Sequence, residues 1–217
     1  MRILLTAGPT YEPLDPVRFL GNRSTGKMGY ALAEAFAAAG AEVTLISGPS
    51  ALPDPAHAQI RTQRVETADQ MYAAAAAVAP AADIWVFAAA VADYRPAYAA
   101  TEKIKKSGDT LTLELVRNVD IAATLGLAKR AEQFSVGFAL ETTNELAHAQ
   151  DKLRRKNFDL VVLNSLRDAG AGFGHDTNKV RVLDRAGRVR NFDLQAKTAL
   201  AHVLVRLVLS YLPASRL

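Results

Sequence analysis

The sequence predicts an α/β fold: a Rossmann-like, doubly wound, mostly parallel sheet with a C-terminal antiparallel hairpin and a flap. Three observations lead to this prediction. Apolar runs alternate with amphipathic segments along most of the chain, which is typical of βαβ units. Two short runs near the C-terminus flank the letters DRAG, which is a hairpin signal. The chain has 217 residues, half of them hydrophobic, which suits one domain over residues 1–217 with a sizeable core.

The predicted strands are short runs of apolar residues. Most of these runs are nearly continuous, as in the buried strands of a parallel sheet. Residues 110–116 instead alternate apolar and polar side chains, as a half-exposed strand does. The runs cover residues 2–7, 42–47, 83–89, 110–116, 135–140 and 158–163, and the hairpin strands are expected at 179–183 and 188–192.

Helices are predicted where apolar residues recur at helical spacing. Residues 28–39 end before Gly40, which stands where a C-terminal cap belongs. Thr67 is a suitable N-cap for a helix over residues 67–79, whose alanines are strong helix formers. Residues 91–107 show no core periodicity and are the predicted flap. Further helices are expected over 145–156, over 195–212 and in the letters VDIAATLG after Asn118.

Composition narrows the functional classes. Lys and Arg number 26 and Asp and Glu 22, a net charge of +4, which is too small an excess to indicate nucleic-acid binding but suits an enzyme that binds phosphates. Because cysteine is absent, the chain has no disulfide, thiolate nucleophile or cysteine metal site. There is no signal-peptide pattern and no apolar stretch of about 20 residues, so a cytoplasmic protein is expected. Four scattered histidines lack metal-binding spacing: His57, His148, His175 and His202.

The loop between the first strand and the first helix has a composition that suits phosphate binding. Its letters GNRSTGKM, residues 21–28, match the spacing of a Walker A loop until Met28, which stands where a Ser or Thr hydroxyl would bind a metal. The loop also starts far later after its strand than a P-loop does. It is therefore either a phosphate-binding loop or a glycine-rich turn that begins a helix.

Two further segments combine strand ends with small or basic residues. The letters AAAVADYRP, residues 88–96, follow a strand, and small side chains there would let a ligand approach the backbone. Within them, Asp93 suits a ribose hydroxyl, a metal or a turn cap. The letters EKIKK, residues 102–106, gather three lysines that fit phosphate oxygens, although such a run is more often a solvated face.

Several single residues are open to two interpretations. Lys152 and Lys156 share one face of a predicted helix, either to bind a triphosphate or as part of a solvated surface. Asn118 is an N-cap or a loop amide facing a ligand, and the cap is the preferred interpretation. Phe138 belongs in the core unless the strand end presents it to a nucleotide base, and Glu141 is a metal ligand or an exposed charge.

Taken in order, these segments resemble the phosphopantothenoylcysteine synthetases. The similarity runs through TAGPTYEPLDPVRFLGNRSTGKMGYALAE, LISGP, AAAVADYRP, EKIKK, VGFALET and KLRRKNFDLVVLN, over nearly the whole chain. The resemblance implies a ligase that activates 4′-phosphopantothenate with CTP as an acyl-cytidylate, releasing pyrophosphate, in coenzyme A biosynthesis. Coupling to L-cysteine then gives 4′-phosphopantothenoyl-L-cysteine and CMP.

The resemblance also assigns residues by position. Arg18 and Asn22 match substrate-binding residues, and Asn22 is expected to polarise the activated carbonyl. Lys103, the first lysine of EKIKK, matches a lysine that contacts the phosphates, so Asn22 and Lys103 are the expected catalytic residues. Val119 replaces a proline usual in the family, and Leu140 replaces an alanine. The expected nucleotide-binding residues are Phe87, Ala88, Ala89, Asp93, Lys103, Asn118, Val119, Asp120, Ile121, Phe138, Lys152 and Lys156.

The resemblance implies Mg²⁺ as the ion, with no metal ligands assigned, and a homodimer as the assembly. Many relatives carry a flavin-dependent decarboxylase ahead of this domain. Because the chain begins directly with the synthetase strand, FMN is not expected. No nucleic-acid or membrane partner is expected either.

Two other classes remain compatible with the pattern. An NAD(P)-dependent oxidoreductase on the same kind of fold needs a glycine pattern for pyrophosphate after the first strand, and TAGPT is a poor match. A non-enzymatic nucleotide- or RNA-binding module would show steep salt dependence, but the modest charge and few clustered aromatics argue against it.

Overall fold

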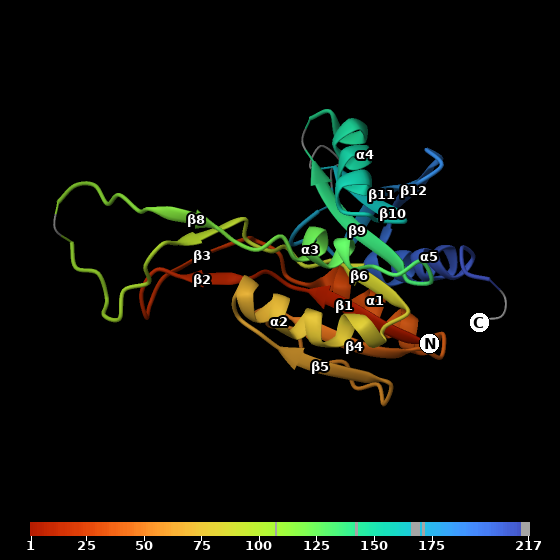
Figure 1. Cartoon of the computed structure of the whole chain (residues 1–217), viewed down its shortest axis with the longest axis horizontal. Helices are drawn as coiled ribbons and strands as arrows, with labels where there is room; N and C mark the ends of the chain where they lie inside the picture. Colours follow the sequence, from red (N-terminus) through yellow and green to blue (C-terminus); the bar gives the residue numbers. More distant parts are fainter. Residues whose placement is uncertain (107, 142, 166–169, 171, 214–217) are drawn as a thin grey trace.

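The computed structural model describes residues 1–106, 108–141, 143–165, 170 and 172–213 (Figure 1). Its centre is an eight-stranded sheet whose neighbours are parallel from β10 to β5 and antiparallel from β10 to β12. This confirms the predicted fold class. In spatial order the strands are β12 (Val189–Ala196), β11 (Thr177–Asp184), β10 (Leu160–Ser165), β9 (Phe134–Glu141), β6 (Ile84–Phe87), β1 (Arg2–Ala7), β4 (Glu42–Ser47) and β5 (Ile60–Arg64).

Helices cover both faces of the sheet. On one face lie α1 (Lys27–Ala38) and α5 (Lys197–Leu209), and on the other α2 (Ala68–Val78), a short 3₁₀ helix η1 (Ala79–Ala81), α3 (Ile121–Leu127) and α4 (Glu145–Arg155). Strand β1 shows the division, because Ile3 and Leu5 pack with α1 and α5 while Leu4 packs with the other set. Burial on both faces explains the nearly continuous apolar runs of the central strands.

Most predicted elements are confirmed, with shifts of a few residues at their ends. Thr67 is the N-cap of α2, and its side chain forms a capping box with Gln70. Gly40 directly follows Ala39, the C-cap of α1. Strand β5 has no counterpart in the prediction, because it lies at the sheet edge and four of its five residues are polar.

Two antiparallel ribbons project from the sheet as an arm. Strand β2 (Tyr11–Pro13) pairs with β3 (Phe19–Gly21), and β7 (Tyr94–Pro96) pairs with β8 (Leu115–Arg117). We call residues 11–21, 94–106 and 108–117 the arm, which extends to the left of the sheet in Figure 1. The two ribbons contact each other through β2 and β7.

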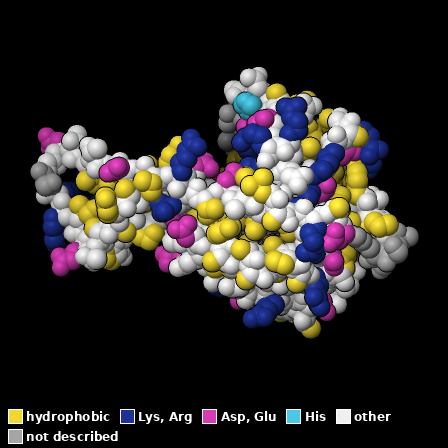
Figure 2. Space-filling model, in the orientation of Figure 1, with side chains coloured by type: hydrophobic (Ala, Val, Ile, Leu, Met, Phe, Trp, Pro, Cys, Tyr) yellow, Lys and Arg dark blue, Asp and Glu magenta, His cyan; other side chains and the backbone are white. Residues whose placement is uncertain are grey.

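The arm overturns part of one strand prediction. Of residues 110–116, only 115 and 116 lie in a strand, and that strand belongs to the arm and not to the sheet. The alternation of apolar and polar residues there does not place one face in a core, because Leu111, Leu113 and Leu115 are all exposed. Figure 2 shows hydrophobic side chains gathered on the arm. Among the described residues, none of the helices is long and apolar enough to cross a membrane.

Candidate functional site

A cleft of about 690 Å³ opens at the carboxyl ends of β1, β6 and β9. Thr6, Phe87 and Phe138 line it from these three strands. The chain leaves β1 toward α1 on one face of the sheet, whereas α3 follows β6 on the other face. Adjacent strands whose connections go to opposite faces create the crevice in which α/β sheets bind ligands.

The loop before α1 forms one wall of the cleft. Gly26 is the N-cap of α1 with φ of 81°, a left-handed conformation that favours glycine. Ser24 Oγ accepts a hydrogen bond from the Gly26 amide at 3.3 Å. Ser24 to Gly29 line the cleft, so the positive end of the α1 dipole faces it. The chain passes through the arm between β1 and α1, so it lacks the short strand-to-helix glycine turn that the oxidoreductase alternative needs.

Asn22 links this loop to the end of β6. Its Nδ2 donates to the carbonyls of Ala90 at 2.9 Å and of Val91 at 3.2 Å. Both amide protons are therefore used within the protein, and its Oδ1 has no hydrogen bond to the described residues. The side chain is exposed and lines the cleft, as the sequence predicts for a ligand-binding residue.

The segment after β6 presents backbone to the cleft. Phe87, Ala88 and Ala89 line the cleft together with Asp93. A hydrogen bond holds this segment in place: the Thr10 hydroxyl accepts from the Ala92 amide at 2.9 Å. The Asp93 carboxylate is exposed and has no hydrogen bond or ion pair with the described residues.

The turn before α3 forms a further part of the wall, with Asn118, Val119, Asp120 and Ile121 all lining the cleft. The prediction that Asn118 caps the helix is wrong. Asp120 is the N-cap, with its Oδ1 accepting from the Ala123 amide at 3.1 Å. Asn118 instead donates from Nδ2 to the Ala92 carbonyl at 2.8 Å, which ties the turn to the segment after β6.

Two lysines of α4 reach the cleft, each paired with a carboxylate. Lys152 Nζ lies 2.7 Å from Glu141 Oε1, and Lys156 Nζ lies 2.9 Å from Asp120 Oδ1. Both lysine side chains are partly exposed, so their ammonium groups remain accessible to a ligand. Glu141 is thus an ion-pair partner at the end of β9, where it also contacts His148.

A second cationic wall was not anticipated from the sequence. Lys27 Nζ pairs with Asp176 Oδ1 at 2.6 Å. Lys197 is buried, and its Nζ donates to the carbonyls of Gly172 at 2.9 Å and His175 at 2.6 Å. Burial lowers the pKa of Lys197, and the neighbouring charge of Lys27 lowers it further. Lys27 and Lys197 both line the cleft.

Two amides accompany these lysines. Asn178 Nδ2 donates to Asn164 Oδ1 at 2.9 Å, and both residues line the cleft. Asn164 lies on β10, Asn178 on β11 and Lys197 at the start of α5. These residues are far apart in the sequence and have no shared motif, so only the folded sheet reveals them as one wall.

Aromatic and apolar groups complete the cleft. Phe138 is half-buried, and it lines the cleft while also packing against the core. Leu140 lines the same wall. Among the described residues there is no group of three or more His, Cys, Asp or Glu that could hold a metal ion.

Two predicted site residues lie elsewhere. Arg18 and Lys103 are on the arm and do not line the cleft. The Arg18 guanidinium pairs with the buried Asp15 carboxylate and donates to the Ile104 carbonyl at 3.1 Å. The Arg18 hydrogen bond, aided by backbone amides of Val17 and Ile104, holds the pKa of Asp15 well below its usual range. Arg18 and Lys103 are thereby brought near each other but not to the cleft.

Known proteins are similar to almost the whole of this chain. A cysteine/cysteine sulfinic acid decarboxylase from an unknown prokaryotic organism is 46% identical over 209 residues, which are 96% of this chain and 58% of that protein. The coenzyme A biosynthesis bifunctional protein CoaBC of Vibrio cholerae serotype O1 is 44% identical over 209 residues, which are 95% of this chain and 52% of that protein. The chain thus spans little more than half the length of these curated relatives.

A solved structure and a family match cover the chain more completely. The crystal structure of the C-terminal domain of a coenzyme A biosynthesis bifunctional protein CoaBC has a TM-score of 0.81 and 41% identity, over 97% of this chain and 96% of that one. Residues 1–212 match the family described as the DNA/pantothenate metabolism flavoprotein C-terminal domain. Since that match extends over almost the whole sequence and the fold is shared with the solved domain, the chain belongs to the DNA/pantothenate metabolism flavoprotein C-terminal domain family.

Proposed function

We propose that the chain is a phosphopantothenate–cysteine ligase, which activates 4′-phosphopantothenate with CTP and couples it to L-cysteine. The observation that carries this proposal is the distribution of charge in the cleft. Lys152 and Lys156 form one cationic wall, and Lys27 and Lys197 form another. A ligase of this kind holds a nucleotide triphosphate beside a second phosphate-bearing molecule, and lysine ammonium groups bind phosphate oxygens as point charges. The family membership supports the same assignment.

The reaction has two steps. A carboxylate oxygen of 4′-phosphopantothenate attacks the α-phosphorus of CTP, pyrophosphate leaves, and an acyl-cytidylate forms. The cysteine amine then attacks the acyl carbon, CMP leaves, and the nitrogen gives up a proton. Both reactants of the first step are anions, so the cationic walls reduce their repulsion. Holding them in line removes an entropic cost that reaches about 7–11 kcal/mol in favourable cases.

The nucleotide is assigned to the wall formed by the end of β6, the turn before α3 and α4. Ala88 and Ala89 leave the backbone open to the ligand, and Phe138 offers a ring to the base. Lys152 and Lys156 would contact phosphate oxygens, with Glu141 and Asp120 holding the ammonium groups in place. Phe87, Asn118, Val119 and Ile121 complete this proposed nucleotide wall.

Asn22 is proposed to bind the acyl-nucleotide intermediate. Its Nδ2 already donates to the Ala90 and Val91 carbonyls. Polarising the activated carbonyl therefore requires one of these bonds to be exchanged for a bond to the intermediate. Such a donor is most valuable where charge develops on oxygen in the transition state.

Magnesium is proposed to bind together with the triphosphate. Mg²⁺ is usually held by one or two carboxylates and by substrate phosphates, and a dedicated protein cage is not required. Asp93 and Asp120 line the cleft, and Asp120 is paired with Lys156. Asp93 is therefore the fitting ligand, and the ion would neutralise phosphate charge there.

We also propose a homodimer in which the arm of one copy serves the cleft of the other. Arg18 and Lys103 are on the arm and outside the cleft of their own chain. The arm exposes large apolar side chains, among them Tyr98, Val17 and Leu111. A second copy would cover this surface and bring both cations to a nucleotide site.

The test is a reconstituted reaction with 4′-phosphopantothenate, L-cysteine, Mg²⁺ and either CTP or ATP. We expect pyrophosphate release that requires 4′-phosphopantothenate, amide product that requires cysteine, and a higher kcat/KM with CTP than with ATP. No pyrophosphate release with either nucleotide would refute the ligase. Equal or better use of ATP would refute only the CTP assignment. Carbon dioxide released from cysteine without nucleotide would instead indicate the activity named for the first relative.

A further inference from the structure

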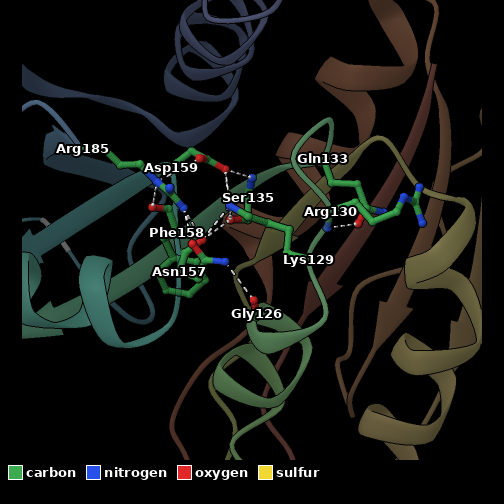
Figure 3. Close-up of polar contacts among 9 residues, drawn as sticks. All are labelled: Gly126, Lys129, Arg130, Gln133, Ser135, Asn157, Phe158, Asp159 and Arg185. Atoms are coloured by element: carbon green, nitrogen blue, oxygen red, sulfur yellow. Dashed lines mark hydrogen bonds and ion pairs between the residues drawn. The ribbon is translucent and has the colours of Figure 1, made fainter.

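A buried polar cluster lies at the amino ends of β9 and β10, at the opposite end of these strands from the cleft (Figure 3). Its centre is Lys129, whose side chain is 5% exposed. Lys129 Nζ donates to Asp159 Oδ2 at 2.6 Å, to the Asn157 carbonyl at 2.6 Å and to Ser135 Oγ at 2.9 Å. These three acceptors match the three protons of an ammonium group, so the group has no capacity left for a ligand.

Asn157 connects this cluster to the cleft, because it directly follows Lys156 in the chain. Its carbonyl accepts from Lys129, from Ser135 Oγ at 3.1 Å and from Arg185 Nη2 at 2.9 Å. Its φ is 53°, a left-handed turn that ends α4. The backbone after Lys156 is therefore held by side chains from three different segments of the chain.

Helix α3 runs from the cluster to the cleft and touches α4 at both ends. Near its C-terminus, the Gly126 carbonyl accepts from Asn157 Nδ2 at 2.9 Å. A Cβ on Gly126 would lie 2.4 Å from the Lys156 carbonyl oxygen, so the two backbones are in close contact. At its N-terminus, the Asp120 carboxylate meets Lys156 Nζ at 2.9 Å. Lys156 is thus fixed by its main chain on one side and by its side chain on the other.

Stability alone does not explain why the charged side chain of Lys129 is buried in this cluster. Burial lowers the pKa of Lys129, and the hydrogen bond and charge of Asp159 oppose that effect only in part. Buried ion pairs are often no more stabilising than apolar residues of similar size, because both charges lose their hydration. Their directed bonds instead select one arrangement of the groups around them.

We propose that Lys129 is a positioning residue for nucleotide binding: it fixes the last turn of α4 against α3, so that Lys156 and the Asn118–Ile121 turn keep their spacing across the cleft. The proposal rests on the proposed function, in which Lys156 and this turn contact the nucleotide. Lys129 itself contacts no substrate.

The same loop contains a matched control. Gln133 is 4% exposed, and its Nε2 donates to the carbonyls of Ala79 at 2.9 Å and Ala82 at 2.8 Å. These bonds secure the loop to η1 and its following residue and make no contact with α4. Figure 3 shows Lys129 and Gln133 on the same connection between α3 and β9. Loss of either anchor weakens the loop, but only Lys129 connects it to the residue after Lys156.

The experiment measures the affinity of the full chain for CTP with Mg²⁺ by calorimetry, in Lys129→Met, Gln133→Leu, Lys156→Ala and the Lys129→Met, Lys156→Ala double variant. Both loop variants are expected to melt at lower temperature. Only Lys129→Met should weaken CTP binding, by about tenfold, a size common for coupled neighbouring residues. In the double variant, the loss of CTP affinity, expressed as a free energy, should be clearly smaller than the sum of the losses in the two single variants.

Other outcomes overturn the proposal. Equal weakening by Gln133→Leu would show general loosening of the loop, and unchanged affinity in Lys129→Met would leave Lys129 a structural residue. If Lys129→Met does not fold, Asn157→Gly keeps the left-handed turn but loses the side-chain bonds to Gly126 and Arg185, and unchanged CTP affinity in that variant would likewise refute coupling between α3 and the end of α4. Unchanged affinity in Lys156→Ala would remove the nucleotide role of Lys156 from the proposed function, and with it the basis of the inference.

Discussion

Large apolar side chains are buried in the sheet of this chain and exposed on its arm. In the sheet, Ile3, Leu4 and Leu5 are at most 1% exposed. On the arm, Tyr98 is 87% exposed and Val17 62%. The apolar side chains of the sheet are covered within one chain, whereas those of the arm are exposed and would be covered only in the proposed dimer. In the proposed function, the nucleotide wall belongs to the body of one chain, meaning the sheet with its helices, whereas catalysis in the proposed dimer depends on the arm.

The largest effect is expected when a residue of the arm is replaced and both catalysis and CTP binding are measured. Arg18→Ala is expected to lower kcat/KM by about 10²-fold, because a charged hydrogen bond to the intermediate is lost. CTP affinity should not change, since Arg18 is assigned to the substrate and the intermediate, whereas the proposed nucleotide wall is built by residues that line the cleft of one chain. Steady-state kinetics and calorimetry on the same preparation provide both values.

A mixing experiment extends this test. Arg18→Ala and Asn22→Ala chains, each poorly active, should recover activity together, because one of the two clefts in a mixed dimer then has both residues. Failure to recover activity in a confirmed mixed dimer would place Arg18 and Asn22 in the site of the same chain. It would refute the proposal that the arm of one copy serves the cleft of the other.

Within the body, the lysines of α4 should control nucleotide affinity. Lys152→Ala or Lys156→Ala is expected to weaken CTP binding by roughly 1.5–3 kcal/mol, the range for hydrogen bonds to charged groups. Arg154→Ala, on the same helix but not lining the cleft, is the matched control and should bind CTP normally. If all three variants bind CTP as the unmodified chain does, the two lysines are only a solvated face.

The apolar surface of the arm should control assembly of the dimer. Leu111→Ser is expected to weaken dimerisation by about tenfold, the effect of losing roughly 1.5 kcal/mol of apolar burial. Leu127→Ser is the control, because Leu127 is 89% exposed but lies on α3 in the body. Sedimentation equilibrium measures both dissociation constants. A larger increase of the dissociation constant in Leu127→Ser would show that the dimer interface lies on the body and not on the arm.

The smallest expected effect concerns pH. Because the pKa of Asp15 is depressed in the folded chain, its carboxylate stabilises the arm above the unfolded value of about 3.9, and this stabilisation is lost as pH falls below it. Between neutral pH and about pH 5 no change is therefore expected. Below that, the amides of Val17 and Ile104 should exchange faster, after correction for intrinsic rates, while those of β1 stay protected. Asp15→Asn should abolish the pH dependence, and its persistence there would assign it to another group.

The sheet could be predicted from the sequence because its apolar periodicity is local. Strands β1 and β4 have the predicted bounds, since both are apolar segments next to clear turn residues. Among the short strands of the arm, only part of β8 coincides with a predicted strand. These strands are three residues long and, in β7 and β8, pair residues some twenty positions apart, so no local pattern marks the pairing.

The candidate site was predictable in part for the same reason. The segments that end β6, precede α3 and form α4 each have a recognisable sequence, and the fold brings them to one cleft. Asn118 was assigned to the wrong role because Asp120, two residues later, is an equally good capping residue and lies closer to the first turn. Lys197 looks like an ordinary helix lysine, and only the packing of α5 reveals that it is buried.

The position of α5 has a consequence for how the chain is made. Helix α5 packs against α1 and also contributes Lys197 to the cleft, whereas the N-terminus of α1 lines that cleft from far earlier in the sequence. Since a ribosome releases α1 long before α5, the cationic wall of Lys27 and Lys197 assembles only after α5 has been synthesised and docked. An interrupted product that lacks α5 would have part of one sheet face uncovered, and its cleft would be incomplete. Incompletely folded chains of this kind are the substrates of cellular chaperones and proteases.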